Sequence, residues 1–411
     1  MVYLDYNATT PLAPEVIDVI TESLREAWGN PSSSHELGCK AKEVISLART
    51  QVANMIGANI SDIIFTSGGT EGNNWILQMA VKYYHETFKI ECIGDTNNKT
   101  SRPHFITSNI EHDSIKLVLD HFQSEGIADV TFVPVRTTTG AVDVQDILAA
   151  IRPSTIMITV MLANNETGVL QPVSDICHQV KSLKRNIGET KRILLHTDAA
   201  QAIGKVSVNV EDLGVDYLTV VGHKFYAPRI GAIFAKNPGQ TSPIYPLLFG
   251  GGQERNFRPG TENTPMIAGL GKAAQLVFDN VGMYHSHMLE IRNYLELKLI
   301  ENFQDSVCFN GKFQCSERLP NTCNVSFIGS KSIKGHEILS NVPSLQASVG
   351  AACHAQNRPS SILLAIGVPE AVAWSALRIS VGRETRKEDI DSVIQDLVVF
   401  FNQRKSLVQG H

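Results

Sequence analysis

The chain has 411 residues, a formal net charge of −5 at pH 7, and 43% hydrophobic and 19% charged residues, a composition typical of globular proteins. The length suffices for roughly two to three domains' worth of core. The sequence contains no block of basic residues and no run of about 18 apolar residues, so we expect neither nucleic acid as a partner nor a membrane span. The first residues, MVYLDYNATT, lack the features of a secretory signal.

The seven cysteines have irregular spacing and form no C-x-x-C pair. This pattern argues against a disulfide framework and against a structural zinc site. A reducing cytosol is therefore the expected compartment. We expect six of the cysteines to be small hydrophobic side chains without chemical function, and Cys353 to be the exception.

Short apolar runs alternate with helical patterns over the first 240 residues, and we predict seven strands. They cover residues 62–66, 104–107, 130–135, 155–162, 192–197, 216–221 and 231–235. Several are apolar on both faces, which is typical of strands in a sheet covered on both sides. Helical stretches such as 173–185 lie between them. This alternation predicts an α/β domain with a mostly parallel sheet.

The character of the sequence changes after residues 250–263. A helical pattern covers about 265–303, with a break expected near Gly282, and an α+β unit follows that closes with a helix over 387–401. We therefore predict a large α/β domain at 14–282 and a small α+β domain formed by 1–13 and 283–411. The polar stretch 94–103 is expected to be a surface insertion.

Polar motifs follow five of the predicted strands. In chain order they are SGGTEGNN, EHDS, NNETG, HTDAAQ and GHK. Ligands of an open parallel sheet bind beyond the carboxyl ends of its strands. The five motifs are therefore expected to line one cleft, a conclusion that depends only on the strand predictions.

The motif SGGTEGNN combines a glycine-rich turn with the start of a helix. Backbone N–H groups in such a turn bind anions together with the helix N-terminus. The motif matches neither the P-loop nor the G-x-G-x-x-G pattern, so one phosphate is a better fit than a nucleotide. A Gly-Gly pair can also be a simple turn.

Lys224 follows a strongly apolar strand, and Asp198 ends a neighbouring one. Partial desolvation would lower the pKa of Lys224 and make its neutral amine available for a Schiff base, although a lysine there can also extend to solvent. A buried Asp198 needs a cationic partner. The two residues could simply pair with each other.

His112 lies in SNIEHDSIKLVL, just before an apolar helical pattern. Asp113 or Ser114 could be the N-cap of that helix and accept its free backbone N–H groups. A metal site is a further alternative, because nitrogen and oxygen ligands gather near one cleft. However, the sequence has no H-E-x-x-H and no close ligand pair on one helix face, so we expect no metal.

Pyridoxal 5'-phosphate is the ligand that would use every one of these features. The glycine-rich turn would take the phosphate, and Lys224 would take the aldehyde. Asp198 would keep the pyridine nitrogen protonated, so that the ring acts as an electron sink. His112 would stack on the face of the ring.

Ten motifs together resemble the cysteine desulfurase/selenocysteine lyase family of fold-type-I pyridoxal-phosphate enzymes. The resemblance extends in order from Val2 to about Arg383. Its motifs are YLDYNATTP, GNPSSSH, FTSGGTEGNN, EHDS, NNETG, HTDAAQ, GHKFYAPRIGA, RPGTEN, SVGAACH and LRISVGR. The segments VVGHKFYAPRIGA and LPNTCN, and the residues from Leu248 to Ala274, are most similar to the vertebrate-type selenocysteine lyase branch.

The resemblance implies a role for each matched residue. Lys224 would form the Schiff base and then move the α-proton of the substrate. The other implied contacts are Asp198 with the pyridine nitrogen, Gln201 with the phenolic oxygen, His112 with the ring face, Gly69, Thr70 and His223 with the phosphate, and Asn165 and Arg378 with the substrate carboxylate. Thr261 would reach the phosphate of the partner protomer, which implies a homodimer with shared active sites.

Cys353 lies in SVGAACHAQNRPS, which resembles the mobile catalytic loop of the family. The resemblance implies that its thiolate attacks the selenium or sulfur of the bound substrate, leaving alanine and an enzyme-bound chalcogen. Without the resemblance, a lone cysteine beside His354 is more often structural.

Two positions depart from the family pattern. Val221 stands where a serine usually binds the phosphate, so one hydrogen bond would be missing or supplied elsewhere. Ala227 stands where glycine is usual, and a positive φ there would cost energy. Neither change removes a catalytic group.

Asp113 favours selenium over sulfur as the substrate atom. Relatives that act on cysteine typically have a lysine at this position, and an ammonium would favour the Cys353 thiolate whereas a carboxylate disfavours it. Cleavage of the weaker carbon–selenium bond should need a less powerful nucleophile. We therefore expect a lyase that converts L-selenocysteine to L-alanine and releases selenide, with a selenide-accepting protein as a possible partner.

Two alternatives to this function differ in class. A cysteine desulfurase would supply sulfur to iron–sulfur or thiolation pathways, but its long basic scaffold-binding tail is not evident. A non-catalytic assembly protein could have kept the fold. The presence of Lys224, Asp198, His112, Cys353 and Arg378 together argues against the second alternative.

Overall fold

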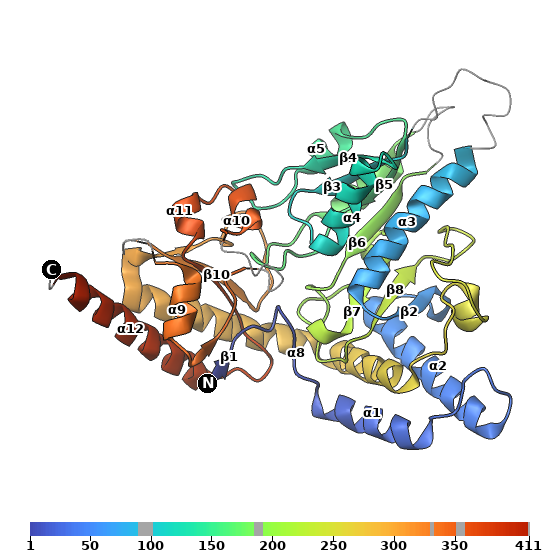
Figure 1. The fold of residues 1–411 in the computed structure, drawn as a ribbon, viewed down its shortest axis with the longest axis horizontal. Coiled ribbons are helices and arrows are strands. Elements are labelled where there is room, and N and C mark those ends of the chain that lie inside the picture. Colours follow the sequence, from blue (N-terminus) through green and yellow to red (C-terminus); the bar gives the residue numbers. More distant parts are fainter. Residues whose placement is uncertain (89–101, 185–191, 329–332, 351–357, 410–411) are drawn as a thin grey trace.

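The computed structural model describes residues 1–88, 102–184, 192–328, 333–350 and 358–409. Figure 1 shows a larger and a smaller part, with the long helix α8 (Thr264–Phe303) extending from one to the other. Both chain ends lie in the smaller part.

The larger part is built on a seven-stranded sheet with the strand order β2-β8-β7-β6-β5-β3-β4. Six of these strands run in the same direction, and β8 runs antiparallel to them between β2 and β7. The strands are β2 (Ile63–Thr66), β3 (His104–Ser108), β4 (Asp129–Val133), β5 (Thr155–Thr159), β6 (Leu194–Asp198), β7 (Tyr217–Val221) and β8 (Gly231–Ala235). All seven predicted strands are present, so the predicted α/β fold with a mostly parallel sheet is confirmed.

Helices cover both faces of this sheet, as the doubly apolar strands require. In β2, Ile64 packs on the side of α3 (Gly69–Phe88) and α4 (Asp113–Ser124), whereas Ile63 and Phe65 pack on the opposite side. The helices of that opposite side are α2 (Glu36–Ile56), α5 (Val144–Ala149), α6 (Val173–Ser182) and the first part of α8. Helices α1 (Pro14–Glu26) and α7 (Val210–Leu213) complete the larger part.

The smaller part has its own sheets and its own hydrophobic cluster. One sheet is antiparallel with the order β12-β10-β9, and β1 pairs with β11 in a second. The strands are β1 (Val2–Tyr3), β9 (Val307–Phe309), β10 (Thr322–Phe327), β11 (Leu345–Gln346) and β12 (Ala376–Ser380). Its helices are α9 (Gly335–Asn341), α10 (Ser361–Ala365), α11 (Glu370–Ala373) and α12 (Lys387–Gln409).

The two hydrophobic clusters do not divide the chain at one point. Leu4 packs with the smaller part, in agreement with the pairing of β1. By contrast, Leu363, Ile366 and Ala373, from the region of α10 and α11, pack in the cluster of the larger part. The division into domains at 14–282 and at 1–13 with 283–411 therefore stays a prediction.

The expected break near Gly282 is wrong, because α8 is one helix of 40 residues. A glycine in a helix costs only about 1 kcal/mol relative to alanine. Val277 and Val281 pack with the larger part, and Tyr284 and Met288 with the smaller part. Packing on both sides of the glycine therefore outweighs its cost.

The expectation that six of the cysteines are small hydrophobic side chains agrees with the burial of only some of them. Cys177 and Cys323 are buried, but Cys39, Cys308 and Cys315 are exposed. Cys92, Cys353 and residues 94–101 of the expected insertion lie outside the described residues. Within the described ranges, no helix has an apolar stretch long enough to cross a membrane.

Candidate active site

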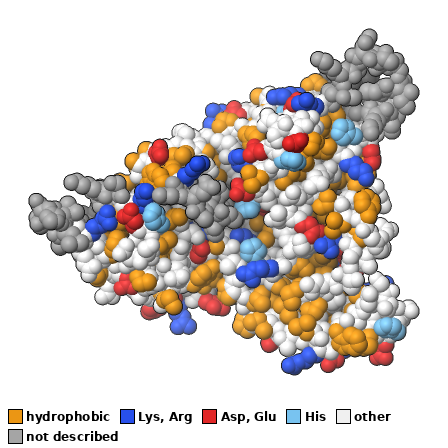
Figure 2. All heavy atoms as spheres, viewed as in Figure 1, with side chains coloured by type: hydrophobic (Ala, Val, Ile, Leu, Met, Phe, Trp, Pro, Cys, Tyr) orange, Lys and Arg blue, Asp and Glu red, His pale blue; other side chains and the backbone are white. Residues whose placement is uncertain are grey.

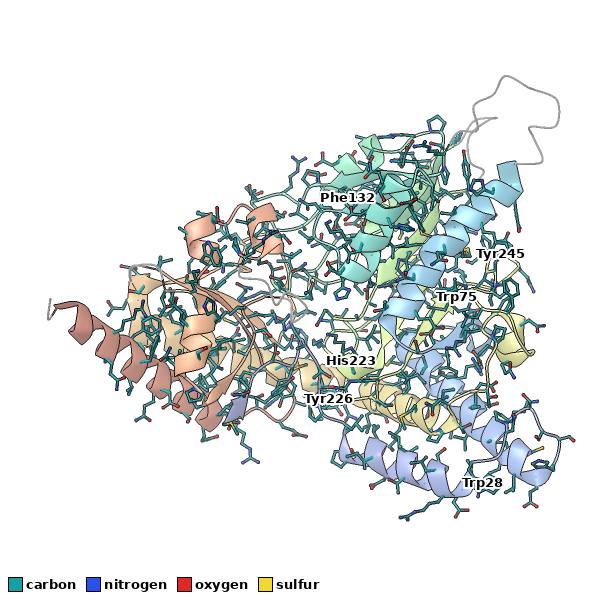
Figure 3. All side chains as sticks on the ribbon, in the orientation of Figure 1. Trp28, Trp75, Phe132, His223, Tyr226 and Tyr245 are labelled. Carbon is teal, nitrogen blue, oxygen red and sulfur yellow. The ribbon has the colours of Figure 1, made fainter. Side chains whose placement is uncertain are left out.

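A cavity of about 280 Å³ lies at the carboxyl edge of the large sheet. Residues from the five predicted strand ends line it, as the argument from parallel strands required. The predicted site residues in its wall are Gly69, Thr70, His112, Asn165, Asp198, Gln201, His223, Lys224 and Arg378. Figure 3 shows His223 and Tyr226 near the middle of the molecule, close to α8 and the N-terminal segment.

Two predicted site residues do not line this cavity, and a third lies outside the described residues. Asp113 lines an adjacent cavity of about 780 Å³, which shares Thr70, His112 and Ser114 with the first. Thr261 is exposed. Cys353 lies outside the described residues, so its placement beside Asp113 stays a prediction.

The glycine-rich turn after β2 leads directly into α3, whose first residue is Gly69. A Cβ atom at Gly69 would lie 2.5 Å from Cγ2 of Val221, so only glycine lets the start of α3 approach the end of β7 this closely. The helix begins with unpaired backbone N–H groups and a positive dipole end, which suit a phosphate. The side chain of Val221 packs there and supplies no hydroxyl, at the position where a serine usually binds the phosphate in the family.

His223 lines the same cavity as Gly69 and Val221. Burial, together with the neighbouring cations Lys224 and Arg229, lowers the pKa of His223 to about 4. Its Nδ1 lies 3.1 Å from the hydroxyl of Thr9. The imidazole is therefore neutral near pH 7 and can donate a hydrogen bond without carrying a charge.

Lys224 ends the short 3-10 turn that follows β7. Its Nζ donates to the carbonyl oxygens of Asn7 and Ala8, at 2.7 and 2.8 Å. These contacts bring the amine into the cavity, toward the N-terminal segment. The alternative of a lysine that extends to solvent is thus wrong.

Asp198 is buried at the end of β6, with 7% exposure. Its Oδ1 accepts from the backbone N–H of Ala200 at 2.9 Å, and its Oδ2 accepts from Nδ2 of Asn73 at 2.8 Å. Both donors are neutral groups. The carboxylate is therefore oriented by hydrogen bonds.

The capping expectation for Asp113 and Ser114 is wrong, because His112 itself is the N-cap of α4. Its Nδ1 accepts from the backbone N–H of Ser114 at 3.1 Å. The helix starts one residue earlier than a preference for serine or aspartate caps would place it. His112 thus both caps α4 and lines the cavity.

Gln201 lies at another wall and has a partner that the sequence did not reveal. Its Nε2 donates to the carbonyl of Asn7 at 3.0 Å, and its Oε1 accepts from Nζ of Lys205 at 3.2 Å. Burial lowers the pKa of Lys205 well below its usual range, and the cations Lys224, Arg383 and Arg378 lower it further. The only signal was a lysine within the small, apolar stretch AIGKV.

Arg378 comes from the middle of β12 and is 1% exposed. Its Nη2 donates to Oδ1 of Asp5 at 2.7 Å, and its Nη1 to the carbonyl of Asn165 at 3.2 Å. Its buried Nε has no hydrogen-bond partner within the described ranges. An arginine in the wall of a cavity, with its guanidinium held in place, suits a carboxylate ligand.

The alanine at position 227, where glycine is usual, carries no strain from a positive φ, but its neighbour Tyr226 does. Tyr226 has φ 67° and Ala227 does not have a positive φ. The Tyr226 hydroxyl accepts from the backbone N–H of Arg383 at 2.7 Å, and the Arg383 guanidinium lies 4.3 Å from the ring centre. These contacts compensate for a conformation that costs about 1 kcal/mol or more.

Together these residues fit pyridoxal 5'-phosphate. The cavity has a glycine cradle at a helix start, an amine at Lys224 and an oriented, buried carboxylate at Asp198. In the described parts of the chain, the cavity included, no group of three or more histidine, cysteine or acidic side chains is arranged to hold a metal ion.

Comparisons with known proteins agree with this chemistry. The sequence model of the aminotransferase class-V family matches residues 2–393. Selenocysteine lyase from Rattus norvegicus is 54% identical over 98% of this chain and 94% of its own length. A cysteine desulfurase IscS from Clostridium botulinum is 38% identical over 99% of this chain and 96% of its own length.

A solved structure has the same fold over nearly the whole chain. It is described as a NifS-like protein, superposes with a TM-score of 0.83 and is 30% identical in sequence. The match covers 98% of this chain and 99% of that one.

Proposed function

Because the chain belongs to the aminotransferase class-V family, we propose that the cavity is the active site of a selenocysteine lyase that depends on pyridoxal 5'-phosphate. The enzyme converts L-selenocysteine to L-alanine, and the selenium is released as selenide when a thiol reductant supplies two electrons. The observation that carries this conclusion is the meeting of Lys224, Asp198, His112 and Arg378 in one cavity. The selenocysteine lyase from rat, similar over nearly its full length, supports it.

The cofactor would be held at both ends of the cavity. Gly69, Thr70 and the neutral His223 suit its phosphate, and Asp198 suits its pyridine nitrogen. Lys224 would hold the aldehyde. When bound, the cofactor supplies an electron sink for the α-carbon of an amino acid.

The chain's own groups bind the substrate and move its proton. Arg378, which lines the cavity, would hold the substrate carboxylate, while its bond to Asp5 keeps the guanidinium in place. Lys224 would take the α-proton at Nζ, since two backbone carbonyls already direct this amine into the cavity.

We propose that Asp113 sets the preference for selenium. It is the first residue of α4, and the cavity that it lines shares Thr70, His112 and Ser114 with the active-site cavity. A carboxylate there disfavours a nearby thiolate, and we propose Cys353 as that thiol. A weaker carbon–selenium bond tolerates such a nucleophile better than a carbon–sulfur bond does.

Changing Asp113 to lysine tests this role directly. We expect Asp113→Lys to raise sulfide release from L-cysteine, because the ammonium would favour the thiolate. The matched control is Asp120→Lys, which makes the same change of charge further along α4, where Asp120 pairs with Lys116. Unchanged cysteine turnover in Asp113→Lys would remove Asp113 from the account.

Cysteine desulfurase is the second candidate, favoured by the 38% identity to a desulfurase of that name. The two activities share all the groups named above except for the effect of Asp113. Equal efficiency on L-cysteine and L-selenocysteine would therefore favour the desulfurase.

We further propose a homodimer with shared active sites. Thr261 is exposed, and Phe249 nearby in the chain is 86% exposed. Figure 2 shows hydrophobic side chains gathered over α1 and the adjoining part of α8, where Leu24 and Phe278 are more than half exposed. Light scattering should give twice the 45.0 kDa of the chain. A fully active monomer would contradict the proposal.

A cytosolic location and a protein that accepts the selenide complete the proposal. Both follow from the expectations for the sequence, in particular the irregular cysteines and the product chemistry. Fractionation of cells that express the chain, with selenide transfer measured in the soluble fraction, would test both.

A further inference from the structure

Asn73 is a buried residue of α3 that no role above requires. It is 1% exposed and lines the active-site cavity. Its amide nitrogen donates to Oδ2 of Asp198 and to Oγ of Ser114, both at 2.8 Å. A carboxylate oxygen can only accept, so the nitrogen of this amide must face Asp198. Both of its hydrogens are thereby used.

The chain of hydrogen bonds continues from Ser114 to His112. Because the Ser114 hydroxyl oxygen accepts from Asn73, its hydrogen is available for Nδ1 of His112, 2.9 Å away. The backbone N–H of Ser114 donates to the same nitrogen at 3.1 Å. Nδ1 is thus an acceptor, so the neutral imidazole carries its proton on Nε2.

Asn73 therefore stands between the two side chains assigned to the cofactor ring. One, Asp198, is assigned to the ring nitrogen, and the other, His112, to the ring face. They come from different elements, β6 and the start of α4, and Asn73 belongs to a third, α3. Its oxygen, Oδ1, is buried without a partner within the described residues. A buried amide with an unsatisfied oxygen is costly, which is typical of a group kept for function.

We propose that Asn73 is a positioning residue, which orients the Asp198 carboxylate and, through Ser114, fixes the tautomer of His112. This inference rests on the proposed function, because it assigns the ring of pyridoxal 5'-phosphate to the space between these groups. Asn73 is assigned a role that acts through Asp198 and Ser114. It acts by holding one oxygen of Asp198 while Ala200 holds the other.

Cofactor binding to the apo-protein tests the Asp198 contact. Asn73→Ala should bind pyridoxal 5'-phosphate about 10- to 100-fold more weakly, the loss expected for one hydrogen bond to a charged group. The pH at which the absorbance band of the bound cofactor changes should also shift, because Asp198 would hold the ring proton less well. Asn73→Asp should bind still more weakly, since two carboxylates would then face each other.

The matched control is Asn74→Ala, the same substitution one residue further on. The Asn74 side chain donates to the carbonyl of Thr70, within its own helix, and does not contact Asp198 or Ser114. Asn74→Ala should bind the cofactor as the wild type does, with the same pH midpoint. If Asn73→Ala is folded and matches the wild type within twofold in affinity and in pH midpoint, the proposal is overturned.

A measurement on the apo-protein tests the His112 contact without the cofactor. In protein labelled with ¹⁵N-histidine, His112 should show a protonated Nε2 and an accepting Nδ1. Ser114→Ala keeps the backbone N–H cap but removes the hydroxyl, so the Nδ1 signal should move, and Asn73→Ala should move it in the same direction. A protonated Nδ1 in the wild type, or no shift in either variant, would overturn the proposal.

The two levels of the account fail differently. If the wild-type protein takes up no pyridoxal 5'-phosphate, the proposed function is wrong, and the apo-protein signal of His112 still decides the role of Asn73. If the wild type binds the cofactor and Asn73→Ala binds it equally well, only the positioning role is wrong.

Discussion

The two sheets supply the active-site cavity in different ways. The seven-stranded sheet presents Asp198 and Lys224 at strand ends, where backbone groups and a neutral amide hold them. The three-stranded sheet contributes Arg378 from the middle of β12, held by the carboxylate of Asp5. The larger sheet thus provides a polar edge, whereas the smaller one contributes an arginine from its interior that is held in a buried ion pair.

This difference predicts different consequences of mutation. Substitutions at the strand ends should remove chemistry while the fold survives, because their contacts are local. Substitutions at the ion pair should destabilise the fold as well, since a buried charge would lose its partner.

Lys224→Ala gives the largest expected effect. The variant should stay folded, fail to form the covalent link that colours the protein yellow, and lose activity by about 10³-fold or more. Absorbance of the reconstituted protein and alanine release measure the two effects. Lys236→Ala, which removes a lysine paired with Glu211 on the surface, is the control. A yellow, active Lys224→Ala would contradict the assignment of the strand ends.

Asp5→Asn should be the most destabilising of these changes. It leaves the buried Arg378 without its counter-charge, so the free energy of unfolding should fall by about 3 kcal/mol. Urea denaturation measures the change. The control is Glu337→Gln, which removes the partner of Arg404 in an exposed pair and should cost about 0.5 kcal/mol or less. Equal stability of the two variants would contradict the claim that the smaller sheet depends on its buried ion pair.

Glu111→Gln tests a buried carboxyl at the end of β3. Burial raises the pKa of Glu111 to about 8, and the charge of Asp198 contributes, although the hydroxyl of Ser108 and the backbone N–H of Met161 donate to it. Between about pH 4.5 and 8 the unfolded chain releases this proton while the folded chain keeps it, so stability falls as pH rises.

The glutamine variant cannot release that proton. Its free energy of unfolding should therefore fall less than that of the wild type between about pH 5 and 8, by a difference on the order of 2 kcal/mol. Urea denaturation at several pH values measures this. Parallel pH profiles for the two proteins would show that Glu111 is charged in the folded state.

Val221→Ser is expected to have the smallest effect and the opposite sign. The serine would place a hydroxyl beside Gly69, where the side chain of Val221 now packs. One added hydrogen bond should tighten cofactor binding about fivefold relative to Val221→Ala, which shortens the side chain without adding a donor. Equal cofactor dissociation constants for the two variants would show that the phosphate end lies elsewhere.

Much of the fold and the strand-end half of the site could be predicted from the sequence. A parallel sheet brings its carboxyl ends to one edge, so correct strands were sufficient to group Asp198, Lys224 and His112. Arg378 has no such local signal, because it lies within an apolar strand and its partner Asp5 is far away in the chain. Only the resemblance to a family pointed to it.

The residues that were missed share a physical reason. Both residue types, Asn73 and Lys205, are common on helix surfaces, so the sequence does not show that these two side chains are buried. Asn73 contacts Asp198 and Ser114, which are distant in sequence, whereas Lys205 contacts Gln201, four residues away. His112 is the helix cap because its ring accepts from the backbone N–H of Ser114, two residues further on. The usual preferences for capping residues do not predict a histidine there. In α8, tertiary packing overrode the local signal of Gly282.

The most direct test of the account is the selectivity of the wild-type enzyme. With the reconstituted protein, the kcat/KM for selenide release from L-selenocysteine is compared with the kcat/KM for sulfide release from L-cysteine under the same conditions. The account predicts a ratio of about 10² or more, because Asp113 disfavours the stronger nucleophile that sulfur needs. Comparable values for the two substrates would contradict it.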